Sequence, residues 1–258
     1  MPSAEVQGRL WGARPQDWAA NEEQQTATYR AVLERAGIAA GTTVLDVGCG
    51  TGVFLRLASD AGARVAGVDA SEALLELARR RVPKADLHLG DLQLLPFDND
   101  RFDVVTGFNS FFFAVDIVTA LREAGRVARP GGRVVVQVWG RPDRCDLEAM
   151  KEAVAPFLPG ASGPRRPPDL WKPGVLEAIA LEAGLTPEEA FDASWEYVYP
   201  SEAAMLRGLL AAGGLAVIAE EAGDGAVEAA IVEALAPYRT PDGGYRLENQ
   251  AHILLCSA

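Results

Sequence analysis

The segment best suited to chemistry is Val44-Leu45-Asp46-Val47-Gly48-Cys49-Gly50-Thr51-Gly52, an apolar run that enters a glycine-dense turn. Glycine has no side chain, so we expect main-chain N–H groups and a helix N-terminus here to face a ligand. Asp46 adds a carboxylate where the apolar run ends. A glycine turn bordered by an acid favours a ligand with positive charge, such as an amino acid that carries a sulfonium.

Two other kinds of nucleotide-binding turn fit this segment less well. The pyrophosphate-binding pattern G-x-G-x-x-G requires glycine at position 53, where the chain has Val53. The Walker P-loop requires Gly-Lys-Ser/Thr, which does not occur in the sequence. A nicotinamide oxidoreductase is therefore a weaker interpretation than a sulfonium-binding protein.

Two more acids follow the next two apolar runs. Asp69 comes about 20 residues after the glycine turn, a spacing that lets a carboxylate accept both hydrogens of a ribose diol. Asp91 precedes Leu92, so the acid can accept from an adenine amino group while the leucine packs on the ring. Nicotinamide enzymes share the first feature, and a turn or helix cap would equally explain Asp91.

The elements that must position these acids alternate along the chain. From Thr42 onward, short β-branched runs alternate with helical periods, which is typical of a parallel sheet with helices on both faces. Strands are predicted at Thr43 to Val47, Arg64 to Val68, Asp86 to Leu89, Phe102 to Gly107, Gly132 to Trp139, Ala193 to Tyr199 and Ala251 to Ser257. Helices are predicted at Gly52 to Ala61, Ser71 to Arg81, Val115 to Ala128, Pro173 to Ala183, Ser201 to Glu221 and Gly225 to Leu235.

The whole chain, 1–258, is predicted to form one domain with a cofactor-binding core at 41–140. Residues 1–40 hold an amphipathic helical segment whose aromatic residues suit either a lid or ordinary packing. The C-terminal part, 141–258, contains a Pro-rich stretch, Pro156 to Pro173, which we expect to form a loop-bearing insertion that helps cover a ligand.

Together these segments resemble the class I S-adenosylmethionine-dependent methyltransferases, in particular the ubiquinone-biosynthesis-like small-molecule branch (methyltransferase type 11). The resemblance covers roughly residues 40 to 140, and its most specific part is Leu45 to Gly52. Leu95-Pro96-Phe97, Phe102 to Val105 and Ala128 to Gly132 look like later motifs of that branch. The resemblance implies an α/β, Rossmann-like sheet of seven mostly parallel strands, helices on both faces and an antiparallel last strand.

The resemblance also implies a residue set for S-adenosyl-L-methionine. The turn would surround the methionyl part and Asp46 its amino group, Asp69 would hold the ribose and Asp91 the adenine. Trp18 stands where many relatives carry a Tyr-rich lid. The full implied set is Asp46, Gly48, Cys49, Gly50, Gly52, Asp69, Ala70, Ser71, Asp91, Leu92, Asn109 and Trp18.

The acceptor side offers fewer signals. Phe111, Phe112 and Trp139 could line an apolar acceptor pocket, although core packing explains them as well. His88 and His252 are the two histidines, and both lie within apolar runs that indicate structural roles. No catalytic base is assigned, because in-line transfer of a methyl group gains most from positioning the reactants.

Charge and cysteine content narrow the range of partners and ligands expected for this chain. The net charge is -12, which disfavours nucleic acid and anionic membranes and leaves a small-molecule methyl acceptor as the expected partner. Three cysteines lie far apart and lack metal-ligand spacing, which indicates a reducing compartment and no metal. The N-terminus has no signal-peptide pattern, so the expected location is cytoplasmic, and monomer and homodimer both remain open.

Two classes of function follow. The first is a methyltransferase that acts on a small molecule and releases S-adenosyl-L-homocysteine. The second is a protein that binds the same cofactor for other chemistry, such as cyclisation, or as a binding module. Conversion of the cofactor to its demethylated product separates the two.

Overall fold

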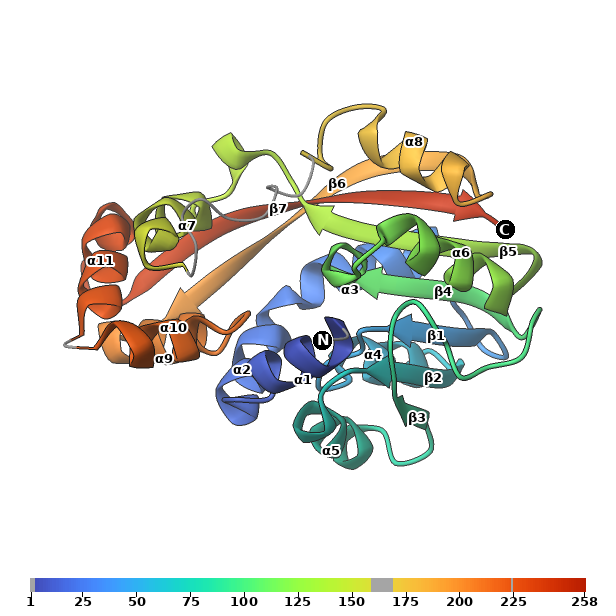
Figure 1. Cartoon of the computed structure of the whole chain (residues 1–258), viewed down its shortest axis with the longest axis horizontal. Coiled ribbons are helices and arrows are strands. Elements are labelled where there is room, and N and C mark those ends of the chain that lie inside the picture. Colours follow the sequence, from blue (N-terminus) through green and yellow to red (C-terminus); the bar gives the residue numbers. More distant parts are fainter. Residues whose placement is uncertain (1–2, 159–168, 224) are drawn as a thin grey trace.

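The computed structural model describes residues 3–158, 169–223 and 225–258, and a seven-stranded sheet forms its centre (Figure 1). The strands lie in the order β3-β2-β1-β4-β5-β7-β6. Their bounds are β1 Thr43–Val47, β2 Arg64–Asp69, β3 Asp86–Leu89, β4 Phe102–Phe108, β5 Ala128–Trp139, β6 Thr186–Tyr199 and β7 Tyr245–Ser257. Strands β1 to β5 pair in parallel, whereas β7 pairs antiparallel with β5 and with β6. The predicted mostly parallel sheet with a reversed last strand is confirmed.

Helices cover both faces of the sheet. Their bounds are α1 Ser3–Trp11, α2 Pro15–Glu22, α3 Thr26–Arg35, α4 Val53–Asp60, α5 Glu72–Arg81, α6 Ile117–Val127, α7 Leu147–Val154, α8 Val175–Glu182, α9 Glu202–Leu210, α10 Leu215–Ala222 and α11 Ala226–Leu235. Val44 on β1 belongs to the same core cluster as residues of α3 and α4, while its neighbour Leu45 joins the cluster of α6 and α8. This division follows from the two-residue period of a strand, which sends successive side chains to opposite faces.

Local signals fix the start of two helices beside the sheet. Ser71 caps α5, and its hydroxyl accepts a hydrogen bond from the N–H of Leu74 at 3.3 Å, as its position predicts. Gly52 begins α4 with a left-handed backbone, at a φ of 79°. A side chain would be strained in this conformation and would also meet Ala78 of α5, so glycine lets α4 and α5 approach closely.

The last two strands are longer than predicted. β6 begins at Thr186 rather than Ala193, and β7 begins at Tyr245 rather than Ala251. The two strands pair from Thr186↔Ser257 to Tyr199↔Tyr245, so main-chain pairing with a neighbour extends each strand beyond its apolar run. Exposed polar side chains on β6 hid this extension from the sequence pattern.

The predicted helix Ser201 to Glu221 is wrong as a single element. It is two helices, α9 and α10, with Gly213 and Gly214 in left-handed conformations between them. The two axes differ by 107°. Within the described ranges no single helix is long and apolar enough to cross a membrane, and only this bent pair has the required length and composition together.

The long ends of β6 and β7 reach beyond the rest of the sheet and carry a second group of helices. Helices α7, α9, α10 and α11 pack together there, and α2 from the N-terminus packs against α9 (Figure 1). Residues of α7 and α9, of the N-terminal helices and of the strand ends line one pocket. Of the predicted Pro-rich loop, residues 159–168 lie outside the described residues.

We expect Leu121→Ala to lower the free energy of unfolding by about 2–5 kcal/mol, because Leu121 of α6 is fully buried against the sheet. Leu181→Ala on α8 is the matched control, since Leu181 is 61% exposed. Urea unfolding monitored by circular dichroism measures both. An equal loss in the two variants would contradict the packing described here.

Candidate functional site

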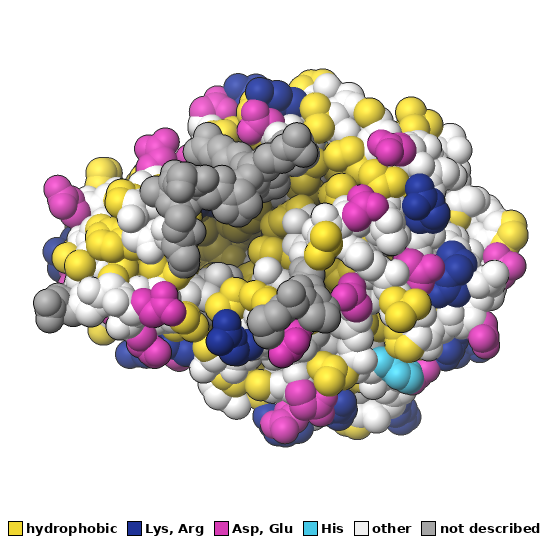
Figure 2. All heavy atoms as spheres, in the orientation of Figure 1, with side chains coloured by type: hydrophobic (Ala, Val, Ile, Leu, Met, Phe, Trp, Pro, Cys, Tyr) yellow, Lys and Arg dark blue, Asp and Glu magenta, His cyan; other side chains and the backbone are white. Residues whose placement is uncertain are grey.

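A pocket of about 190 Å³ lies beyond the carboxyl ends of β1, β2 and β4. Strand order reverses between β1 and β4, because β2 and β3 continue to one side and β5 to the other. Open α/β sheets bind ligands at such a point. Figure 2 shows a hollow with hydrophobic side chains around it on this face of the molecule.

Most of the residues singled out from the sequence meet at this pocket. Those that line it are Trp18, Asp46, Gly48, Cys49, Gly50, Asp69, Ala70, Asp91, Leu92, Asn109, Phe112 and Trp139. Gly52, Ser71 and Phe111 do not line it. Gly52 and Ser71 begin helices beside the pocket, and Phe111 is buried in the core, where its ring lies against Gly107.

The main chain of the glycine turn is already hydrogen-bonded. The N–H groups of Gly48 and Cys49 donate to the carbonyl of Val68, at 2.7 and 3.0 Å. The N–H of Gly50 donates to Asp69, at 2.8 Å. The N–H groups at positions 51 and 52 also have protein acceptors. The expectation that these N–H groups face a ligand is therefore wrong, and the turn has no free donors for a phosphate.

Two strand-end acids of the predicted set are buried at this turn. Asp69 accepts from Gly50 and from the N–H of Ser71, both at 2.8 Å, with one oxygen each. Asp46 accepts from the hydroxyl of Thr106 on β4, at 2.8 Å. A carboxylate has about four lone-pair positions, so each acid can still bind a ligand. No described lysine or arginine forms an ion pair with either acid.

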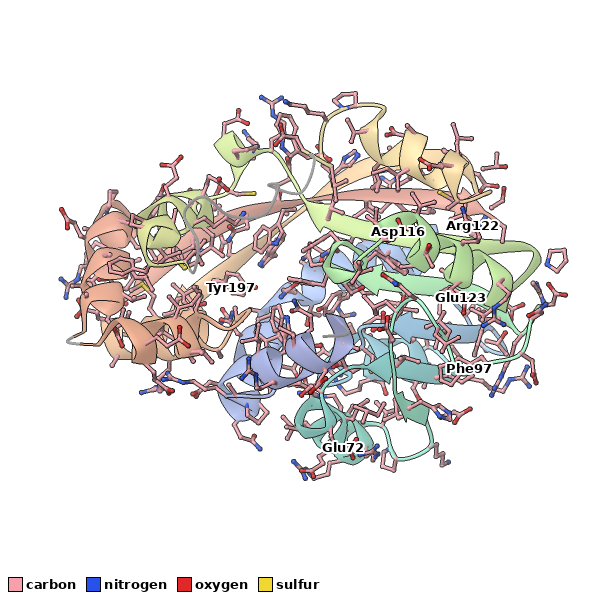
Figure 3. All side chains as sticks on the ribbon, in the orientation of Figure 1. Glu72, Phe97, Asp116, Arg122, Glu123 and Tyr197 are labelled. Carbon is pink, nitrogen blue, oxygen red and sulfur yellow. The ribbon has the colours of Figure 1, made fainter. Side chains whose placement is uncertain are left out.

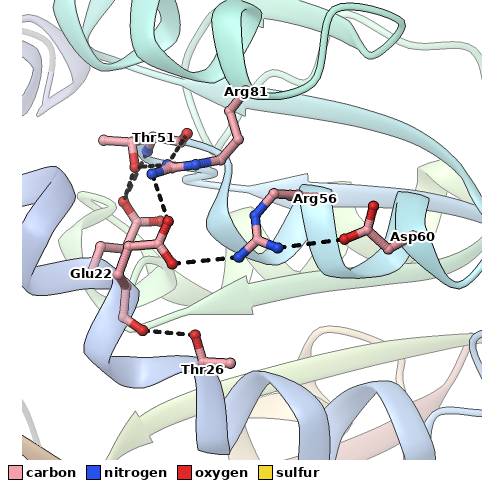
Figure 4. Close-up of polar contacts among 7 residues, drawn as sticks. Glu22, Thr26, Thr51, Arg56, Asp60 and Arg81 are labelled. Atoms are coloured by element: carbon pink, nitrogen blue, oxygen red, sulfur yellow. Dashed lines mark hydrogen bonds and ion pairs between the residues drawn. The ribbon is translucent and has the colours of Figure 1, made fainter.

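A third buried acid, Glu22, comes from the end of α2 (Figure 4). One of its oxygens accepts from both the N–H and the hydroxyl of Thr51, at 2.9 and 2.8 Å. The carboxyl group lies so close to Gly50 that a Cβ there would come within 2.9 Å of it. Glycine at position 50 thus suits the left-handed backbone of the turn, with a φ of 53°, and leaves room for the carboxyl group of Glu22.

The neighbour of this acid secures the same helix to the core. Glu23 pairs with Arg81 at the end of α5, at 2.8 Å, and with Arg56 of α4, at 3.4 Å (Figure 4). Arg81 also donates to the main-chain carbonyl of Thr51, at 2.5 Å. Two consecutive acids therefore hold the N-terminal helices against the glycine turn.

Burial changes the protonation of all three acids. Desolvation raises the pKa of Glu22 to about 7 and that of Asp46 to about 8. Desolvation also raises the pKa of Asp69. The negative charge of Asp69 adds to the raised pKa of both Glu22 and Asp46, whereas hydrogen bonds to each of the three acids oppose the rise. A cation placed among them would favour their charged forms.

Asp91, Leu92 and Asn109 border the pocket from loops after β3 and β4. Asp91 accepts from the N–H of Gln93, at 2.9 Å, and Leu92 is half-buried beside it. Asn109 has a left-handed backbone, with a φ of 52°, and its side-chain oxygen is buried without a hydrogen bond among the described residues. An unpaired buried oxygen in a strained loop residue is typical of a binding position.

The other end of the pocket is apolar and aromatic. Trp139 from the end of β5 lies against Trp195, with ring centroids 5.3 Å apart. Tyr197 of β6 accepts a hydrogen bond from Gln25, at 3.0 Å, and Figure 3 shows Tyr197 between β6 and the N-terminal helices. Helices α7 and α9 close this end with Leu147, Met150, Lys151 and Leu209.

Sequence reasoning missed several lining residues, above all Glu22, Gln25, Tyr197 and the side chains of α7 and α9. Their contacts join segments far apart in the chain, and Gln25 and Tyr197 are 172 positions apart. The adjacent acids Glu22 and Glu23 at the end of an amphipathic segment were the one available signal. His88 and His252 pair with Asp86 and Asp192 and do not line the pocket.

Comparison with known proteins identifies the class. A family model described as a methyltransferase domain matches residues 45–136. The 27-O-demethylrifamycin SV methyltransferase of Amycolatopsis mediterranei is 32% identical in an alignment of 212 positions that covers 77% of this chain and 75% of that enzyme. The chain belongs to the class I S-adenosylmethionine-dependent methyltransferase family, which confirms the resemblance of Leu45 to Gly52.

Other similar proteins agree on the fold. The dTDP-4-amino-2,3,4,6-tetradeoxy-D-glucose N,N-dimethyltransferase of Saccharopolyspora spinosa is 34% identical over 55% of this chain, and the match spans only 56% of that enzyme. A complex of the Haloferax volcanii Trm112 methyltransferase activator and a putative methyltransferase contains a chain with a TM-score of 0.63 and 22% identity, matched over 100% of this chain and 98% of its own. The cyclase SpnF has a TM-score of 0.58 and 24% identity, over 89% of this chain and 80% of its own.

We expect the buried acids to make the protein less stable as pH rises. The folded state holds the Glu22 proton more tightly than the unfolded chain, so stability from this group is full below its usual pKa of 4.5 and is lost as pH rises through about 7. Between pH 5 and pH 8 this loss is about 2–3 kcal/mol. In Glu22→Gln, the free energy of unfolding measured with urea should fall by about that much less between pH 5 and pH 8.

Asp46→Asn should likewise reduce the loss of stability with rising pH, because burial raises the pKa of Asp46 to about 8 in the folded state. The asparagine oxygen can still accept from Thr106, which preserves the hydrogen bond. Identical changes between pH 5 and pH 8 in the wild type and both variants would show that these acids are not buried as described.

Proposed function

We propose that the protein transfers a methyl group from S-adenosylmethionine to an apolar small-molecule acceptor. The observation that carries this proposal is the set of three buried carboxyl groups, Glu22, Asp46 and Asp69, at a glycine turn whose N–H groups are already paired. Such a site disfavours phosphate and favours a cation. S-adenosylmethionine carries both an ammonium and a sulfonium, and it supplies the methyl group.

The character of each lining residue fits one part of this cofactor. Asp46 and Glu22 line the pocket, and the carboxyl group of Glu22 lies against Gly50, so an amino group can bind near these acids. Asp69 keeps lone pairs for a ribose diol, and Asp91 with Leu92 can hold an adenine ring. Gly52 and Ser71 contribute by starting α4 and α5, and Trp18 covers the pocket from α2.

The acceptor would lie toward β5 and β6. There Phe112, Trp139, Met150, Tyr197 and Leu209 offer a largely apolar lining, which suits a molecule with a sizeable hydrophobic part. The relatives named above act on a rifamycin and on a nucleotide-linked amino sugar, so the family accommodates large acceptors. Positioning of acceptor and cofactor with exclusion of water can lower the activation free energy by about 7–11 kcal/mol. No catalytic base is assigned.

We expect the wild-type protein to bind S-adenosylmethionine in isothermal titration calorimetry. Asp69→Ala should weaken this affinity by at least about tenfold, because it removes a charged hydrogen-bond acceptor from the ribose position. Asp60→Ala is the control, since Asp60 on α4 is 67% exposed in its side chain and does not line the pocket. Equal affinity in Asp69→Ala and the control would refute the assignment.

Turnover distinguishes the proposed reaction from cyclisation or simple binding. Enzyme, methyl-labelled S-adenosylmethionine and a panel of hydroxylated and aminated aromatic acceptors are expected to yield S-adenosylhomocysteine and a labelled product. Mass spectrometry detects both. Tight cofactor binding with no demethylated cofactor across the panel and cell extracts would favour the alternative, in which the cofactor serves other chemistry.

A further inference from the structure

We propose that the methyl acceptor carries an anionic group, a carboxylate or a similar acid, and that Lys151 of α7 binds it. This inference deepens the proposed function and rests on it, since it concerns the apolar end of the same pocket. It makes Lys151 a residue that determines specificity among apolar acceptors of similar shape.

Charge is divided between the two ends of the pocket. The acids Glu22, Asp46, Asp69 and Asp91 lie at or just after the ends of α2, β1, β2 and β3, on the side of the pocket formed by these elements. Among the described lining residues Lys151 is the single cation, and it comes from α7, beside β5 and β6. An acceptor with a positive charge would be drawn toward the cofactor end, whereas an anion is attracted to Lys151 and repelled by the acids.

The lysine is held at the aromatic wall. Its ammonium group lies 4.4 Å from the centroid of the Trp139 ring, and Trp139 in turn packs on Trp195, which is only 3% exposed. The cation therefore lies over the same ring that an apolar acceptor would contact. A flat acceptor against Trp139 would bring an acidic substituent within reach of the ammonium group.

The cation keeps donors available for a ligand. Glu148, one turn earlier on α7, accepts from Lys151 at 3.1 Å and does not line the pocket. An ammonium group has three donors, so this pair leaves others for an acceptor anion. Because Glu148 also competes for the charge, its removal should strengthen anion binding, whereas removal of Lys151 should weaken it.

The chain contains a matched control for this arrangement. Lys172 pairs with Asp169 three residues earlier, at 2.6 Å, and lies 5.7 Å from the centroid of the Trp171 ring. It reproduces the pairing of a lysine with an acid three residues earlier and the contact of that lysine with a tryptophan ring, but it does not line the pocket. A general effect of lysine removal on protein charge would therefore appear in Lys172→Met as well.

The test compares 2-naphthoate with its neutral amide, 2-naphthamide, in the presence of saturating S-adenosylhomocysteine. Calorimetry measures the ratio of their dissociation constants, which cancels the contribution of the shared ring. In the wild type we expect naphthoate to bind about two- to fivefold more tightly than the amide, the size of a partly exposed ion pair. Lys151→Met should abolish this preference, and Lys151→Arg and Lys172→Met should keep it.

Glu148→Gln should raise the preference above that of the wild type. Equal binding of acid and amide by the wild type, or a preference that survives Lys151→Met, would overturn the proposal. The proposed function fails separately: it is lost if S-adenosylmethionine does not bind or is not demethylated, whatever the naphthoate ratio. Cofactor binding in Lys151→Met, measured first, establishes that this variant is folded.

Discussion

The structure depends on the burial of three carboxyl groups where strand order reverses. Glu22, Asp46 and Asp69 have lost most of their water, and desolvation raises the pKa of each. Their hydrogen bonds to Thr51, Thr106 and the turn offset part of this cost. Among the described residues, no lysine or arginine pairs with Asp46 or Asp69. Burial of these unpaired acids costs stability, and it prepares the site for a cationic ligand.

The same constraint explains why the N-terminal helices belong to the site. Glu22 reaches the glycine turn only because α2 is held there, and Glu23 holds it by pairing with Arg56 and Arg81. The turn therefore lies between β2 and α2. The carbonyl of Val68 on β2 accepts from two of its N–H groups, and the carboxyl group of Glu22 on α2 accepts from a third. The same helix, α2, therefore covers the pocket and places the third acid, Glu22, in it.

Much of the pocket half that we propose for the cofactor was predictable because its signals are local. Asp46, the glycines and Asp69 occupy fixed positions after apolar runs, and parallel pairing of β1 with β2 brings those positions together. The opposite was predicted for the N–H groups of the turn, since spacing cannot reveal that Val68 already accepts from two of them. Glu22 was not predicted as a site residue because its hydrogen-bond partner, Thr51, is 29 positions away in the sequence.

The apolar half, which we propose for the acceptor, was less predictable because it is assembled from long-range contacts. β6 and β7 extend past their apolar runs, and the helices that close the pocket attach to that extension. No local sequence signal marks Met150, Lys151 and Leu209 as lining residues, because they reach the pocket only through this packing. Substitutions on α7 and α9 can thus change the apolar end of the pocket without touching the acids of β1 and β2, because the two sets of residues share the pocket and belong to different elements.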